Sequence, residues 1–283
     1  MIAVLAGILL APLLPGTIQT GKAFAQGRRG TSPIQPYRTL KRLWGKSAVD
    51  PEGTGVVYRA APAVAAAALL AALGTLATGG DALALVGLLA LARGAVAAAA
   101  WDTGNGFALM GAARDLALAV FAEALLVLAL LLIAQPAHST DLDAMRAATA
   151  GWEIWSEPSH WCALLAFALV IVAETGRQPV DNPDTHLELT MIHEGPLLEY
   201  AGRDLAYLHW VAAARHWLIL TLAALLYLPH ADSVATLVVA LPVLCVALAA
   251  VETAQAKMRI LRVPALLGLG ALIALAGAAA WPA

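Results

Sequence analysis

The chain has 283 residues, 61% of them apolar and 13% charged, and its formal net charge is −2. A mean hydropathy of +0.77 is too high for a soluble globular domain, and the balance of acidic and basic residues excludes a broadly basic, nucleic-acid-binding surface. Cys162 and Cys245 lie far apart in apolar runs without the paired spacing of zinc or iron–sulfur ligands, so no cofactor is expected in this chain.

Apolar runs of about 20 residues, the length that crosses the hydrocarbon core of a bilayer, recur along the chain. They predict an all-α polytopic integral membrane protein in which residues 1–283 form a single transmembrane domain. Because no basic residues precede the first run, an uncleaved helix is expected there instead of a signal peptide. About eight transmembrane helices are predicted, at residues 2–20, 58–78, 82–101, 114–134, 160–177, 208–229, 234–254 and 263–281.

The basic residues indicate how these helices are oriented. The loop at 21–57 carries many of them, whereas the loop at 135–159 is mainly acidic. Because cytoplasmic loops are enriched in Lys and Arg, the loops at 21–57 and 178–207 are predicted to face the cytoplasm and to dock partners. Both termini are then expected on the outer, periplasmic side of the cytoplasmic (inner) membrane.

Two ionisable residues, Arg93 and Glu123, lie inside predicted helices, where a charge costs about 2.5–3.5 kcal/mol on insertion scales. Arg93 lies nine residues before Asp102, and Glu123 lies nine residues after Arg114, which places both about 13 Å from the helix ends. Equal depth on two helices joined by a short loop predicts a buried Arg93–Glu123 ion pair. The pair is either a structural lock between the helices or part of a proton relay.

Carboxylates concentrate in the segment that follows the predicted helix at 160–177. Pro179 is expected to end that helix near Arg177, and Asn182 is expected to cap a short helix at about 183–193. A longer helix is predicted from 197 to 228. The acids of the segment are Glu174, Asp181, Asp184, Glu188, Glu194 and Glu199. They are either capping acids of a solvated loop or part of a hydrophilic path.

Motifs for chemistry within this chain are missing from its sequence. His186, Glu188, His193 and Glu194 do not form a His-Glu-x-x-His motif, so a metal site is not expected there. The sequence has no nucleophile elbow, phosphate loop or dinucleotide fingerprint, and catalysis by this chain alone is not expected. Arg215 and His216 precede a short apolar run, and both are expected to face protein or a wet cavity.

The segment Glu174-Thr-Gly-Arg-Gln-Pro-Val-Asp181 resembles the signature of the membrane subunit that forms the quinone chamber of respiratory complex I, often called subunit 1. Its continuation from Asp181 to Arg203 is similar to the corresponding subunit of group 4 membrane-bound nickel–iron hydrogenases, the formate hydrogenlyase type. Relative to the complex I pattern, His193–Pro196 looks like an insertion. Gly27–Arg38, Asp102–Gly104, Met110–Asp115 and Ala122–Ala124 also resemble this hydrogenase component, so the match spans about residues 20–260.

The resemblance implies a membrane-anchoring and proton-coupling subunit of a hydrogenase or formate hydrogenlyase-like oxidoreductase complex. Its partners would be hydrogenase-like large and small subunits, which would hold the nickel–iron centre and the iron–sulfur clusters, and antiporter-like membrane subunits. The implied proton-path residues are Arg93, Glu123, Glu174, Asp181, Glu188 and Glu199. The implied docking residues are Arg28, Arg29, Gln35, Arg38, Arg177, Asp184 and Arg203. The alternatives are a quinone-chamber subunit of a complex I-like dehydrogenase, a passive membrane anchor and a free-standing transporter.

Overall fold

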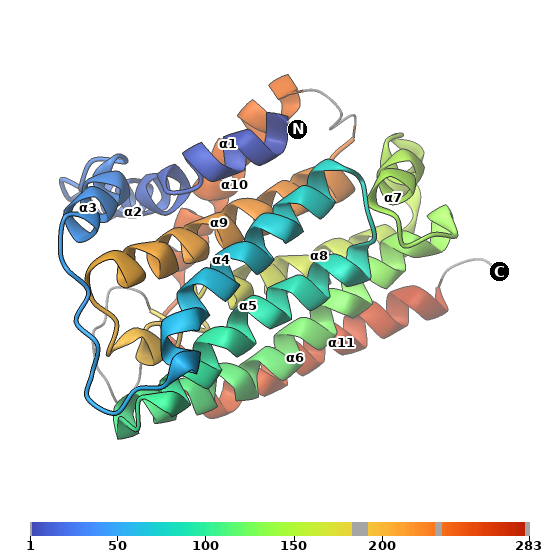
Figure 1. The fold of residues 1–283 in the computed structure, drawn as a ribbon. Coiled ribbons are helices and arrows are strands. Elements are labelled where there is room, and N and C mark those ends of the chain that lie inside the picture. Colours follow the sequence, from blue (N-terminus) through green and yellow to red (C-terminus); the bar gives the residue numbers. More distant parts are fainter. Residues whose placement is uncertain (1, 183–191, 230–233, 281–283) are drawn as a thin grey trace.

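The computed structural model describes residues 2–182, 192–229 and 234–280 as a bundle of helices (Figure 1). Within these residues, six helices are long and apolar enough to cross a membrane, which confirms an all-α polytopic membrane protein. They are α4 (Val56–Ala77), α5 (Ala82–Asp102), α6 (Gly106–Ala137), α9 (Gly202–Tyr227), α10 (Val234–Ala254) and α11 (Val263–Ala279). Except for α6 and α9, they begin and end within a few residues of the predicted ranges.

The predicted spans at 2–20 and 160–177 correspond to shorter helices. The first is divided into α1 (Ile2–Leu10) and α2 (Leu13–Ala25), because Pro12 has no amide proton to continue the helical hydrogen bonds. The second is α8 (Pro158–Glu174), an apolar helix of 17 residues that ends before the predicted position of Arg177. The remaining helical elements are α3 (Gln35–Trp44), α7 (Leu142–Thr149), η1 (Glu153–Ser156), η2 (Gly195–Leu197) and η3 (Ile260–Arg262).

Helix α6 begins at Gly106, well before the predicted start at residue 114. The side chain of Asn105 accepts a hydrogen bond from Phe107 N at 2.8 Å and so caps the free amide groups of the first turn. Apolar periodicity alone missed this start, because Gly106 and its neighbours carry little hydropathy. The early start places Asp115 well inside the helix.

Helix α9 lies at the centre of the bundle. Its residues 217–224 are all buried, and it packs against α4, α8 and α10. Helix α6 packs against α5, α8 and α11, so these helices share one apolar core. In Figure 1 the long helices run side by side, and the start of α1 and the end of α11 lie at the same end of the bundle as α7, away from α3.

The chain from 192 to 201 crosses the end of the bundle near α3. The rings of Tyr58 and Tyr200 stack with centroids 4.4 Å apart, and Tyr200 Oη donates to the carbonyl oxygen of Tyr58 at 2.8 Å. Gly202 begins α9 with φ +57°, and a Cβ there would collide with the carbonyl oxygen of Ser47. The predicted start of this helix at residue 197 was therefore wrong. Residues 183–191 of the predicted helix at 183–193 lie outside the described part of the chain.

Turn η2 touches α6 through two glycines. A Cβ on Gly111 would lie 2.7 Å from the Cα atom of Gly195, so the two backbones meet only because neither residue has a side chain. This contact fixes the position of the residues that follow Ile192 against the membrane helices.

The substitution Gly111→Ala is expected to lower the melting temperature of the purified protein, because overpacking of this kind costs about 1–3 kcal/mol. The matched control is Gly87→Ala in α5, where the added Cβ meets none of the described atoms within 4 Å. The control is expected to be neutral or stabilising, since Ala is the better helix former. Equal melting temperatures for the two variants would contradict the close approach.

Candidate functional site

Arg93 on α5 is the centre of a buried charged cluster. Its side chain is only 5% exposed, and its Nη1 atom lies 3.0 Å from Glu123 Oε1 on α6. Its Nη2 atom lies 3.0 Å from Glu174 Oε2 at the end of α8, and its Nε atom lies 3.6 Å from Asp115 Oδ2 on α6. The predicted Arg93–Glu123 ion pair is thus confirmed, and it is one of three ion pairs made by a single guanidinium.

A second arginine adds a positive charge to this cluster. Arg215 on α9 has its Nε atom 3.5 Å from Glu174 Oε2, and its Nη2 atom donates to the carbonyl oxygen of Leu89 at 2.8 Å. The expectation that Arg215 faces protein is therefore met. The other carboxylate oxygen of Glu174, Oε1, is buried and has no hydrogen-bond partner among the described residues. Two arginines thus face three carboxylates in a dry interior.

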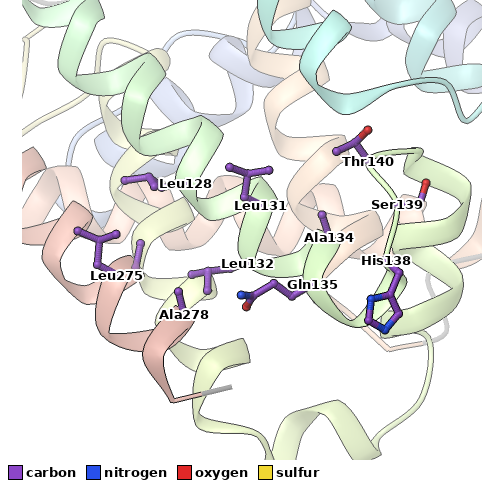
Figure 2. A pocket seen from close by; sticks show the side chains of 11 residues that line it. Leu128, Leu131, Leu132, Ala134, Gln135, His138, Ser139, Thr140, Leu275 and Ala278 are labelled. Atoms are coloured by element: carbon purple, nitrogen blue, oxygen red, sulfur yellow. The ribbon is translucent and has the colours of Figure 1, made fainter. Parts of the chain in front are cut away.

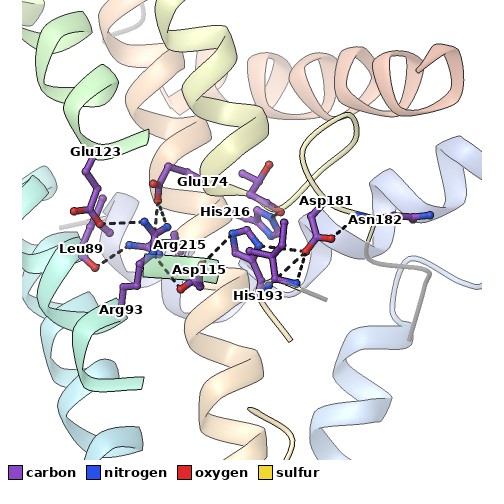
Figure 3. Close-up of polar contacts among 12 residues, drawn as sticks. Leu89, Arg93, Asp115, Glu123, Glu174, Asp181, Asn182, His193, Arg215 and His216 are labelled. Carbon is purple, nitrogen blue, oxygen red and sulfur yellow. Dashed lines mark hydrogen bonds and ion pairs between the residues drawn. The ribbon is translucent and has the colours of Figure 1, made fainter. Parts of the chain in front are cut away.

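Asp181 and His193 extend the row of charged groups toward the loop after α8 (Figure 3). His193 Nδ1 lies 3.4 Å from Asp181 Oδ2, and His193 Nε2 lies 3.9 Å from Asp115 Oδ1. Lys257 Nζ donates to Asp181 Oδ1 at 2.8 Å. Burial raises the pKa of Asp181, but the hydrogen bonds from His193 and Lys257 outweigh burial and hold that pKa well below its usual range.

A cavity of about 200 Å³ connects these groups. Part of its wall is apolar and comes from Leu69, Val96, Leu197, Leu208 and Val211. The polar part includes Arg93, Asp115, Glu174, Asp181, His193 and Arg215. A space of this size bounded by charged groups is large enough to hold several water molecules.

A larger hollow of about 690 Å³ lies between α6 and α11, toward the other end of α6 (Figure 2). Leucine and alanine side chains form most of its wall, and Gln135 and His138 are among its polar residues. None of its lining residues is an acid, a lysine or an arginine. The smaller cavity is therefore the better candidate for proton chemistry, although it has less volume.

A separate ion cluster joins α2 and α10 to the end of α8. Glu252 Oε2 lies 3.4 Å from Lys22 Nζ and 3.4 Å from Arg177 Nη1, and all three side chains are buried. Arg177, predicted to contact a partner, is thus 3% exposed and held inside the chain. The cluster fastens the α2–α10 pair to the rest of the bundle.

The structure brings together some of the predicted site residues and separates others. Arg93, Glu123 and Glu174 form one cluster, and Asp181 reaches it through His193. Glu199 lies elsewhere, at the α5–α6 turn, where its carboxylate accepts a hydrogen bond from Asn105. Among the predicted docking residues, Arg28, Arg29, Arg38 and Arg203 are exposed and Gln35 is half-buried. Asp184 and Glu188 lie outside the described residues.

Two residues of the cluster, Asp115 and His193, were not among the predicted site residues. Asp115 was placed at the membrane surface because the start of α6 was predicted too late. His193 was considered only as a metal ligand, and no sequence periodicity links it to Asp115, which lies on a different element. Among the described residues, no group of three or more His, Cys, Asp or Glu side chains could hold a metal ion.

Residues 1–281 match the family model described as NADH dehydrogenase. The chain belongs to this NADH dehydrogenase family. Hydrogenase-4 component C of Escherichia coli is similar to this family member, with 33% identity over 78% of this chain and 72% of that protein. Formate hydrogenlyase subunit 4 of the same organism is 31% identical over 78% of this chain and 74% of that protein.

Other relatives match less of the chain. A subunit of the NADH-quinone oxidoreductase of Chlorobaculum parvum, the complex I counterpart, is 28% identical over 50% of this chain and 41% of that protein. The fold is that of a chain in the structure of the membrane-bound sulfane sulfur reductase, an archaeal respiratory membrane complex. The TM-score is 0.84, with 22% identity, 98% coverage of this chain and 96% coverage of that chain.

The substitution Arg93→Gln is expected to destabilise the protein by about 3–5 kcal/mol, because it leaves buried carboxylates without their main counter-charge. The control is Arg59→Gln, which removes a pair 3.1 Å from Asp50 whose side chains are 66% and 41% exposed. Exposed pairs of this kind contribute about 0–1 kcal/mol. Unfolding of the purified protein in mixed detergent measures both effects, and equal losses would argue against a special role of Arg93.

Proposed function

We propose that this chain is the membrane subunit through which a hydrogenase-like or complex I-like oxidoreductase couples electron transfer to proton movement. The observation that carries the proposal is the Arg93 cluster, where two arginines face three carboxylates in the membrane interior. Membrane proteins keep such groups in hydrocarbon chiefly for transport, proton relay or ligand binding. Because the carboxylates exceed the arginines, the cluster is suited to take up and release one proton.

A path for that proton begins at the loop after α8. Asp181 lies at the end of the cavity nearest this loop, and Glu174 and Glu123 lie deeper, on opposite sides of Arg93 (Figure 3). A proton that enters beside Asp181 would reach α6 without crossing the apolar core. From Glu123, which is partly exposed on the surface of α6, it would pass to antiporter-like partner subunits.

The proposal includes eight crossings of the cytoplasmic membrane, with both termini on the outer side. α8, together with the residues around it, is long enough to approach the span of a bilayer core, and α1 with α2 would form a broken crossing. The exposed residues Arg28, Arg29, Arg38 and Arg203 would then face the cytoplasm. There they would dock hydrogenase-like large and small subunits that hold the nickel–iron and iron–sulfur centres, and the chain itself would need no cofactor.

A second candidate function is quinone binding in the same cavity. Its wall combines apolar side chains such as Leu69 and Val96 with polar groups such as His193, the mixture that a quinone headgroup requires. A quinone that copurifies with the complex and is displaced by substitution of Val96 with a larger residue would favour this function.

The substitutions Glu123→Gln and Glu174→Gln are expected to reduce proton movement in vesicles containing the whole complex at least about tenfold, because an amide cannot carry the proton. Dye-linked redox activity of the soluble partners and assembly of the complex are expected to change little. The control Glu153→Gln removes an exposed carboxylate of the outer loop and is expected to change neither quantity. Normal proton movement in both buried variants would indicate a passive anchor.

A further inference from the structure

We infer that His193 is the residue that transfers protons between Asp181 in the cytoplasmic loop and Asp115 in the membrane. This inference rests on the proposed proton-coupling function. It adds to that function a specific carrier at the step where the loop meets the transmembrane helices. No other described side chain has ionisable atoms within 4 Å of both Asp181 and Asp115.

The geometry of the imidazole suits such a transfer. Its two nitrogens face different carboxylates, with Nδ1 3.4 Å from Asp181 Oδ2 and Nε2 3.9 Å from Asp115 Oδ1. The second distance is longer than a hydrogen bond, so a small swing of the ring or a bridging water would complete it. The side chain is 30% exposed at the edge of the cavity, which leaves room for both.

The backbone around His193 holds the ring in this position. The amide groups of Ile192 and His193 both donate to Asp181 Oδ2, at 3.3 and 3.4 Å. On the other side the ring packs on Gly176, where a Cβ would lie 3.1 Å from Nδ1. Gly176 has φ +60° and stands in the segment Glu174–Asp181, so the turn after α8 both accepts the ring and supplies its partner.

The transfer balances in two steps. Protonated Asp181 gives its proton to Nδ1 of a neutral imidazole that already carries a proton on Nε2, which leaves an Asp181 carboxylate and an imidazolium. The Nε2 proton then passes to the Asp115 carboxylate, which leaves neutral Asp115 and a neutral imidazole with its proton on Nδ1. Rotation of the ring or exchange with cavity water restores the first tautomer. No electron is transferred in either step.

The surroundings of the ring contain charges of both signs. Besides Asp115 from α6 and Asp181 from the loop, the carboxylate of Glu174 on α8 and the ring of His216 on α9 interact electrostatically with His193. Lys257, which follows α10, reaches the same site through Asp181. This mixture permits both the neutral and the charged ring, as a carrier requires, instead of fixing the ring as a permanent cation.

Two substitutions in the whole complex separate a proton carrier from a charge clamp. His193→Lys keeps a positive charge between the carboxylates but has one nitrogen, and His193→Asn keeps hydrogen-bonding capacity near the Nδ1 position without a titrating group. Both are expected to lower proton movement in vesicles at least about tenfold. Dye-linked redox activity is expected to stay within about twofold of the parent. The control is His138→Asn, an exposed position outside the cavity whose φ of +48° suits asparagine.

The variant His193→Ala supplies a readout that a structural role would not move. Added 4-methylimidazole is expected to restore part of its proton movement in a concentration-dependent way, because the enlarged cavity admits a free imidazole. Full proton movement in His193→Lys, or no response of His193→Ala to imidazole, would overturn the role of His193. Failure of the parent complex to move protons would overturn the proposed function instead.

Discussion

The burial of one guanidinium governs the arrangement of this bundle. A charge in hydrocarbon must be paired, and Arg93 on α5 satisfies this requirement with carboxylates from α6 and α8. Arg215 brings α9 to the same point by contacting Glu174 and a carbonyl oxygen of α5. Four helices rich in alanine and leucine, which could pack in many registers, thus share one electrostatic reference point. Apolar packing fills the space around it but is less specific about direction.

The same constraint reaches the loop after α8. Asp181 is buried, and it is stabilised by Lys257 from the end of α10 and by His193 from the segment before η2. The loop is therefore held by charged groups on both sides, and the stacked rings of Tyr58 and Tyr200 anchor its continuation to α4. A soluble partner that contacts this loop would act on groups already connected to the membrane interior.

Hydropathy predicted most of the long helices, because their apolar runs are the length of a bilayer core. It could not predict the start of α6, which depends on the Asn105 cap, or the break at Pro12 in a run that remains apolar throughout. Two isolated charges within apolar runs were enough to predict the Arg93–Glu123 pair. The equal-depth argument was less accurate than its result, since it used the late start of α6. The third and fourth members, Asp115 and Glu174, required the fold, because long-range contacts between helices leave no periodic pattern in the sequence.

The sharing of Arg93 by three acids has a consequence for how the cluster responds to change. When one carboxylate gains a proton, the guanidinium is freed to hold the other two more strongly, so the three acids titrate as one cooperative unit. A pH midpoint measured for such a unit belongs to the whole cluster and to no single residue. For the same reason, the effects of substitutions at Glu123 and Glu174 will not add, and their interaction energy measures how much of the guanidinium each acid holds.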